Sequence, residues 1–353
     1  MQNDDPWAID PVGQPARVPE EAEPPPPASL EQALLALDHK SAPVFAVLDG
    51  AQFDNLPQEL LLGDFVSRPL YLDRGDNNPE QIITAPQMVW LDERPEKPTG
   101  RGPQQAIPDL LALIANRPAA VFWQCPDGAD ALYRHLRGIN MVRYPKGAID
   151  DLEEAKSVVT GETRSPETPD THILVLFRHA DANVIAQISS TMDALETARF
   201  YGPTSRLLFS PDPDWANGCE WLQVDRPVDL PEARRGHLTL SLETIRRIDG
   251  VRLQRNRQRI AAYLRKVAPD QTRGLSDTKL DAMIARYMTE AHSYGVRSEA
   301  AMGRWCFLQV ITEGRIGQHR ELTEYVARPD GAKSADDRVR DLMSMAASGM
   351  VEK

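Results

Sequence analysis

Residues 172–184 read HILVLFRHADANV. The apolar run HILVLF is typical of a strand, because its aliphatic and β-branched side chains suit a pleated surface. The run stops at a polar group that contains Arg178, His179 and Asp181, and a helix is predicted to begin near Ala182. A strand that is followed at once by a helix is the repeating unit of an α/β domain.

The same alternation extends to both sides of this stretch. Further strands are predicted at VFAVLDG (44–50), APQMVWLDE (85–93), AAVFWQC (119–125), NMVRY (140–144), RLLFS (206–210) and CEWLQVD (219–225). Helices are predicted at LEQALLAL (30–37), NLPQELLLGDF (55–65), DLLALIANR (109–117) and DGADALYRHLRGI (127–139). The pattern predicts an α/β domain over residues 29–240, built on a mixed sheet with flanking helices.

Two details of this region are specific enough to check against a structure. Leu56, Leu60 and Leu61 are expected on one buried helix face. Residues 93–108 contain four prolines and two glycines, and this composition favours a loop.

The two ends of the chain differ from the middle. Residues 1–28 hold eight prolines and six acidic residues, a composition that cannot bury enough apolar surface to fold and that predicts a disordered tail. Residues 241–353 show helical spacing almost throughout, and Leu253, Ile260, Leu264 and Val267 are in phase along the first long segment. This spacing predicts a second, all-α domain.

The composition of the chain limits the kinds of molecule that it is expected to bind and the compartment in which it is expected to act. A net charge of −12 argues against general affinity for nucleic acid or for anionic membranes, because phosphate contacts need an excess of Lys and Arg. The three cysteines lie far apart, so neither a disulfide framework nor a structural zinc site is expected. No signal sequence and no membrane-spanning run is recognised, which favours a cytoplasmic protein.

The polar group after the strand has two interpretations. As a catalytic site, His179 would act as a general base, Asp181 would orient it, and Arg178 would bind an anion. The sequence offers neither a nucleophile elbow nor a glycine-rich phosphate loop to complete such a site. As scaffolding, Asp181 would cap the following helix and Arg178 would pair with an inward carboxylate. We favour the scaffolding interpretation.

Two other groups of residues could carry chemistry. His135 and Arg137, on either side of Leu136, could form an anion site, although a solvated or salt-bridged helix face is the simpler interpretation. The seven histidines show no metal-binding spacing, and neither a metal nor another cofactor is expected.

Residues 246–266 carry eight Arg or Lys against one acid. They could contact nucleic acid, pair with acidic loops of the same chain, or dock an acidic protein partner. For the last case the candidate partner-binding residues are Arg252, Arg255 and Arg259.

Five short motifs occur in an order that resembles the type VI secretion effector chaperone or adaptor family. They are VFAVLDGAQFDNLPQEL, PLYL, APQMVWLDE, ALYRHLRGINMVRY and VLFRHADANVI, and together with later stretches they cover roughly residues 44–315. The residues at matching places include Asp49, Pro69, Leu70, Tyr71, His135, Leu136, Arg137, Phe177, Arg178 and Asp181. The strand-to-helix turn departs from the family pattern, because His179, Ala180, Ala182 and Asn183 replace its usual aromatics, proline and second arginine.

The resemblance implies a non-enzymatic protein. Such adaptors bind a toxic effector protein in the cytoplasm and help to load it onto a VgrG spike or a PAAR-type tip. Asp49, His135, Leu136, Arg137, Arg178 and Asp181 would then be structural. The alternative hypothesis is a hydrolase or phosphotransfer enzyme that uses His135, Arg137, Arg178 and Asp181, and it requires these four side chains to converge in an open pocket.

Overall fold

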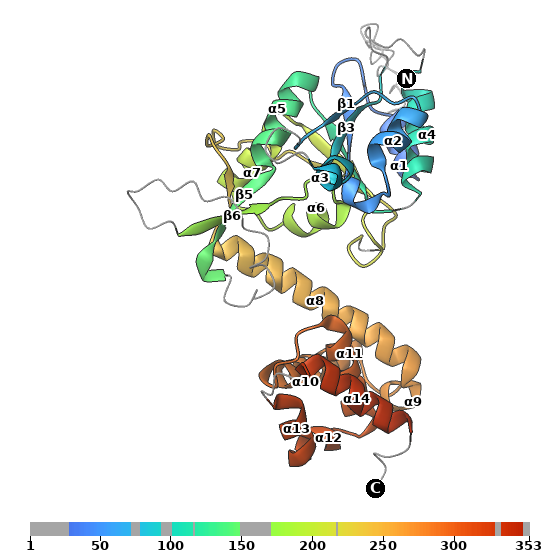
Figure 1. Cartoon of the computed structure of the whole chain (residues 1–353), viewed down its shortest axis with the longest axis vertical. Coiled ribbons are helices and arrows are strands. Elements are labelled where there is room, and N and C mark those ends of the chain that lie inside the picture. The colour runs from blue at the N-terminus through green and yellow to red at the C-terminus, as the bar shows by residue number, and fades with distance from the viewer. Residues whose placement is uncertain are drawn as a thin grey trace, which may run out of the picture.

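A computed structural model describes residues 28–71, 78–92, 101–115, 117–148, 171–216, 218–328 and 333–348 of the 353-residue chain. The predicted tail lies outside the described residues except for Ala28. Figure 1 shows an α/β region and a helical region that are joined by the long helix α8.

A six-stranded sheet forms the centre of the α/β region. Its strands, in spatial order, are β2 (Ser67–Pro69), β3 (Gln87–Trp90), β1 (Val44–Leu48), β4 (Ala120–Gln124), β7 (Arg206–Phe209) and β8 (Leu222–Asp225). Every neighbouring pair in this sheet is antiparallel. The two central strands, β1 and β4, are buried along their whole length, so both faces of the sheet are covered.

Alternate residues of β1 supply two hydrophobic cores. Phe45 and Val47 pack in the core that is covered by α5 (Ala129–Ile139), α6 (Ala182–Ile188) and α7 (Ala194–Tyr201). The other side chains of β1 pack in the opposite core. The helices of that second core are α1 (Leu30–Leu35), α2 (Leu56–Leu62) and α4 (Pro103–Ile114), which lie together on the right of Figure 1.

A smaller sheet stands at the side of the α/β region. Its spatial order is β6 (His172–Leu176), β5 (Met141–Pro145) and β9 (Leu238–Thr239). β5 pairs with β6 antiparallel and with β9 parallel, so this is the mixed sheet of the fold. The predicted fold class, an α/β region followed by helices, is confirmed.

The helical region begins with α8 (Leu242–Val267) and has a core of its own. The remaining helices are α9 (Pro269–Thr272), α10 (Asp277–Ser293), α11 (Glu299–Ile311), α12 (Arg315–Gln318), α13 (Arg320–Ala327) and α14 (Ala335–Ala347). Serine side chains cap α8, α10, α11 and α14, each accepting a hydrogen bond from a first-turn N–H group.

Helix α8 belongs to both regions. Near its start, Ile245 and Ile248 pack in the core under α6 and α7, whereas Ile260 and Leu264 pack in the helical core. Between them the helix is largely solvent-exposed. Of the four apolar residues that are in phase along α8, Ile260 and Leu264 are buried, whereas Leu253 is 49% and Val267 40% exposed. The helix leaves one core before it enters the next.

Three further details differ from the sequence prediction. Residues 103–108 are the first turns of α4 rather than a loop, because Pro103 occupies the first turn, where a missing N–H group is tolerated. Pro108 lies inside the same helix, whose buried face outweighs the lost hydrogen bond. Leu61 is 71% exposed, since it lies one residue beyond Leu60 on a helix that ends at Leu62 and has no cover on that side. The short helix α3 (Pro79–Thr84) was not predicted at all.

Candidate functional site at the strand-to-helix junction

Arg178 connects the end of β6 to the end of β1. Its guanidinium donates two hydrogen bonds to Oδ2 of Asp49, of which the bond from Nε is 3.1 Å long. The same guanidinium lies 3.3 Å from Oδ2 of Asp181. Asp49 is buried and also accepts a hydrogen bond from the backbone N–H of Ala51, so this carboxylate is held by a contact besides Arg178.

Asp181 is the N-cap of α6. Its Oδ1 accepts hydrogen bonds from the N–H groups of Asn183 at 2.9 Å and Val184 at 3.3 Å. The predicted capping role is confirmed. Burial raises the pKa of this carboxyl, and the charge of Arg178 and the two N–H groups act against that shift.

His179 is fully buried beside these residues. Its Nε2 lies 2.6 Å from Oδ1 of Asn140, and the amide of Asn140 donates to the carbonyl of Leu70. Since the Asn140 oxygen must accept, Nε2 of His179 carries the proton. Burial lowers the pKa of His179 to about 3, so the ring is neutral at physiological pH. A neutral, enclosed imidazole is a structural group here and not a solvent-accessible base.

Asp49, Asn140, Arg178, His179 and Asp181 are called the junction cluster below. The cluster joins the large sheet to the small one. Asn140 precedes β5, Asp49 follows β1, and the other three follow β6. One more hydrogen bond lies beside the cluster, because the hydroxyl of Tyr71 donates to the carbonyl of Phe177 at 3.3 Å.

His135 lies on the buried face of α5, although a solvated or salt-bridged helix face was expected. The reason is its spacing, because Leu132, His135, Leu136 and Ile139 follow the three-and-four period of one stripe. Nε2 of His135 donates to the carbonyl of Phe200 at 2.8 Å, and Nδ1 faces a guanidinium nitrogen of Arg199 at 3.2 Å.

Burial, aided by Arg199, lowers the pKa of His135 to about 4. Arg137 lies elsewhere on the helix, with its guanidinium over the ring of Tyr133.

A second network around α7 was not predicted. Glu196, which is buried, accepts hydrogen bonds from the N–H of Asp193 and the N–H of Ser241, and from the hydroxyl of Thr244. It therefore holds the first turn of α8 against α7. The sequence signal was present, because an acid three residues after an N-cap Asp is a capping box, and the structure contains that box.

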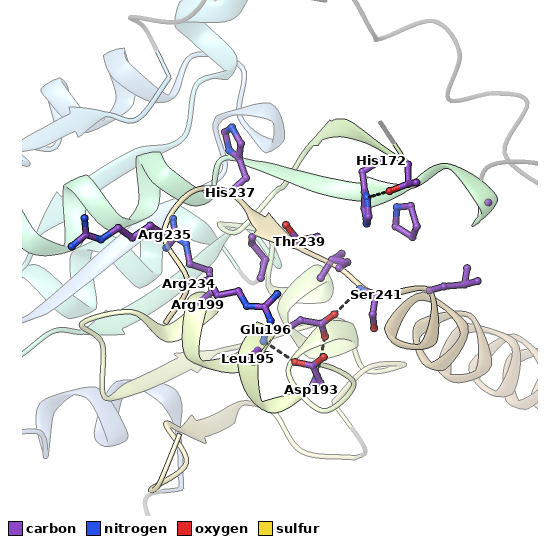
Figure 2. Close-up of a pocket in the computed structure, with 16 residues that line it drawn as sticks. His172, Asp193, Leu195, Glu196, Arg199, Arg234, Arg235, His237, Thr239 and Ser241 are labelled. Carbon is purple, nitrogen blue, oxygen red and sulfur yellow. Dashed lines mark hydrogen bonds between the residues drawn. The ribbon is translucent and has the colours of Figure 1, made fainter. Parts of the chain in front are cut away.

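A cavity of about 570 Å³ opens beside this network. Figure 2 shows Arg199 and Arg234 near each other on its wall and Asp193 and Glu196 beside Ser241. The two acids are used in capping, whereas Arg234 and Arg235 are exposed. Arg199 is bonded to the carbonyls of Gly236 and Gly138, so Arg234 and Arg235 carry the positive charge of the wall that remains open to a ligand. The cavity also reaches β6, at His172.

The candidate partner-binding arginines of α8 have partners within the chain. Arg252 donates to Oε1 of Gln187 on α6 at 2.7 Å. Arg259 contacts Asp214 of the α/β region at 3.0 Å and Glu299 of α11 at 2.8 Å. Arg255 donates to Gln258 on its own helix. These contacts favour the intramolecular interpretation of the basic run for Arg252 and Arg259, and they make Arg259 a bridge between the two regions.

The four residues of the enzyme hypothesis lie in two places. Arg178 and Asp181 belong to the junction cluster, whereas His135 and Arg137 lie on α5. None of these four residues lines the cavity of Figure 2. Within the described residues, no group of three or more His, Cys, Asp or Glu side chains is placed to hold a metal ion. None of the helices in the described ranges combines the length and apolar character of a membrane span.

No protein-family model, no curated protein and no solved structure matches this chain. The family resemblance therefore rests on the five sequence motifs alone.

Proposed function

We propose that this chain is a non-enzymatic adaptor that binds a type VI secretion effector in the cytoplasm and presents it to a VgrG or PAAR-type spike protein. The proposal comes from the motif resemblance, and the geometry of the motif residues supports it. It assigns the two regions of the chain to protein partners and assigns no reaction to the junction cluster.

The observation that carries the proposal is that four of the five motifs meet in one network. Asp49 of the first motif binds Arg178 of the last. Leu70 of the second motif accepts from Asn140 of the fourth, which in turn contacts His179 of the last. These contacts bring residues that lie far apart in the sequence into one joint, and the joint fixes the shape of the α/β region. Such a joint is expected if the motif residues maintain a binding surface and not a catalytic pocket.

The connection between the regions suits a protein that holds two partners. The middle of α8 is exposed between two separate cores, so the two regions are tied by one helix and a few surface contacts such as that of Arg259. Each region presents its own surface, and the helix sets the distance between the surfaces.

Co-expression tests this function directly. A candidate effector protein from a neighbouring gene is expressed with this chain and without it, and the amount of soluble effector and its half-life are measured. We expect more soluble effector, with a longer half-life, when the chain is present. Equal amounts and equal half-lives under both conditions would contradict the chaperone role and would reopen the enzyme hypothesis.

The junction cluster supplies the matching control. Arg178→Lys keeps the charge but loses the forked geometry that binds Asp49 and Asp181 together. If the chain acts by shape, this variant should lose effector protection only to the extent that it loses stability, as measured by its urea midpoint. A fully stable Arg178→Lys variant that no longer protects the effector would show that Arg178 itself contacts the partner.

A further inference from the structure

Strand β6 is an edge strand with an unusually apolar outer face. It lies at one end of the order β6–β5–β9, and Figure 1 shows it at the side of the α/β region near the start of α8. The side chains of Leu174 and Leu176 are 40% and 51% exposed. An exposed apolar edge is usually blocked in soluble proteins by charge, proline or a covering segment, since it otherwise recruits another strand.

The hydrogen-bond register shows which backbone groups of β6 are open. The N–H of Phe177 bonds to the carbonyl of Asn140, and the N–H of Lys146 bonds to the carbonyl of Thr171. Bonded and non-bonded pairs alternate in an antiparallel ladder, so the N–H and C=O groups of Leu174 and Leu176 point away from β5. No backbone group elsewhere in the described part of the chain bonds to these two residues.

The open backbone groups and the exposed side chains belong to the same residues. Leu174 is paired with Arg143 and Leu176 with Met141, on the face opposite the buried Val142 and its partly buried partner Val175. A strand added to this edge would bond to Leu174 and Leu176 and, with apolar residues at alternate positions, cover both leucine side chains.

We propose that β6 is a strand-addition site that takes an extended segment of the effector protein. This inference rests on the proposed function for the identity of the partner. The segment has apolar side chains at alternate positions and no proline at the positions that face β6. It has acidic residues where it passes His172, because His172 lines the same cavity as the exposed Arg234 and Arg235.

A second copy of the chain is a poorer occupant on two grounds. A five-residue strand is only about 17 Å long. It can cover only a fraction of the roughly 800 Å² per partner that a stable interface between folded proteins buries. Each copy also carries a net charge of −12, so two copies repel each other at long range. A flexible segment needs no wider contact and meets the positive cavity wall.

The test measures amide hydrogen exchange at single-residue resolution, for the full chain alone and for its complex with the co-expressed effector. In the isolated chain the amides of Leu174 and Leu176 should exchange quickly while that of Val175 is protected by β5. In the complex both leucine amides should become protected, by about tenfold or more. Leucine amides that stay fast in a formed complex would overturn the strand-addition site and leave the adaptor function standing.

Other outcomes separate the remaining possibilities. Protection of both amides in the isolated chain would also overturn the proposal. Such protection that rises with protein concentration, together with a dimer mass, would identify a second copy as the occupant, and protection in a monomer would mean that the chain covers its own edge. Failure of the wild-type chain to bind the effector would remove the proposed function and this inference with it.

A pair of variants provides the binding test. Leu174→Lys with Leu176→Lys places charges on the edge without touching the bonds to β5, and the effector retained in a pull-down should fall about tenfold. Leu61→Lys with Leu62→Lys makes the same change on α2, where the leucines are 71% and 78% exposed, and should retain the effector fully. Equal retention by both pairs would contradict a role for β6.

Discussion

Arg178 and Asp49 lie 129 positions apart in the sequence, yet two nitrogens of the arginine converge on one carboxylate oxygen of the aspartate. This pair closes the gap between the end of β1 and the end of β6. Asp181, on the other side of Arg178, caps α6. The polar group that interrupts HILVLFRHADANV therefore acts as a joint between elements, and several predictions about its neighbourhood can be tested.

The first prediction concerns the helix cap. Asp181→Ala removes the acceptor for two N–H groups of α6 and should lower the free energy of unfolding by about 0.5–2 kcal/mol. Asp181→Asn keeps an acceptor at the cap and should lose less. Urea denaturation midpoints measure both. Equal loss in the two variants would mean that the charge facing Arg178, and not the cap, stabilises this turn.

The second prediction concerns the close approach of α7 to α5. A Cβ atom on Gly202 would lie 2.3 Å from Nδ1 of His135, and the φ angle of 51° already disfavours other residues. Gly202→Ala should cost about 2–4 kcal/mol of stability. Gly250→Ala is the matched control, because nothing lies within 4 Å of its Cβ position in the exposed part of α8.

The control variant should be about as stable as the wild type or up to about 1 kcal/mol more stable, since alanine favours a helix. Thermal unfolding of the two variants side by side makes the comparison. A Gly202→Ala variant as stable as the Gly250→Ala variant would show that His135 and α7 are not packed as described.

The third prediction is a loss of stability in acid that comes from buried histidines. An unfolded histidine binds a proton near pH 6.5, whereas His135 stays neutral down to about pH 4 and His179 to about pH 3. The unfolded chain therefore binds more protons over this range. Stability contributed by the two neutral rings is present above about pH 6.5 and is lost as the pH falls toward 4 and then 3.

The size of this effect is on the order of a few kcal/mol, because one pKa unit corresponds to about 1.4 kcal/mol. His135→Gln keeps a donor for the carbonyl of Phe200 but cannot titrate. Its urea midpoint should fall less steeply between pH 6.5 and pH 4 than that of the wild type. Identical slopes for the two proteins would show that His135 is charged in the folded state.

The fourth prediction concerns the bridge between the two regions. Arg259, Asp214 and Glu299 are all about half exposed, so their contacts should add less than about 1 kcal/mol to stability. These contacts should instead help to fix the orientation of the helical region relative to the α/β region. Arg259→Glu should leave the thermal midpoint nearly unchanged but broaden the distribution of distances between the regions, as measured by small-angle X-ray scattering. Arg246→Glu, an exposed change on the same helix, should not.

Salt provides an independent check on this prediction. Raising the ionic strength weakens exposed ion pairs and should shift the wild type toward the scattering profile of Arg259→Glu. A wild-type profile that does not change with salt would mean that packing around Ile248 and Ile260, and not the arginine bridge, holds the regions in place.

The elements that were predicted from the sequence are those with a strong apolar period. β1, β4 and α5 are examples, because their buried residues form continuous runs or a helical stripe. β2 and β9 have three and two residues, and such short strands show no period to detect. The antiparallel order of the large sheet depends on long-range pairing, which no local pattern encodes.

The residues of the junction cluster were predicted only in part, because local contacts can be read from the sequence and long-range contacts cannot. The cap at Asp181 depends on the next few residues and was visible in the sequence. The partner of Arg178 could be expected only as some inward carboxylate, because Asp49 follows a strand that is distant in the sequence. His135 was expected at a solvated or salt-bridged face, although its spacing from Leu132 and Leu136 would have placed it inward. Its partner Phe200 belongs to a helix that was not predicted.

The proposed adaptor role is tested most directly by a three-component pull-down in which the spike protein is the bait. The effector is added with the wild-type chain, without it, or with the chain cut within the exposed part of α8 so that its two regions are separate. We expect the effector on the spike only when the intact chain is present, with all three proteins recovered together. Recovery of the effector on the spike in equal amount without this chain would contradict the adaptor function.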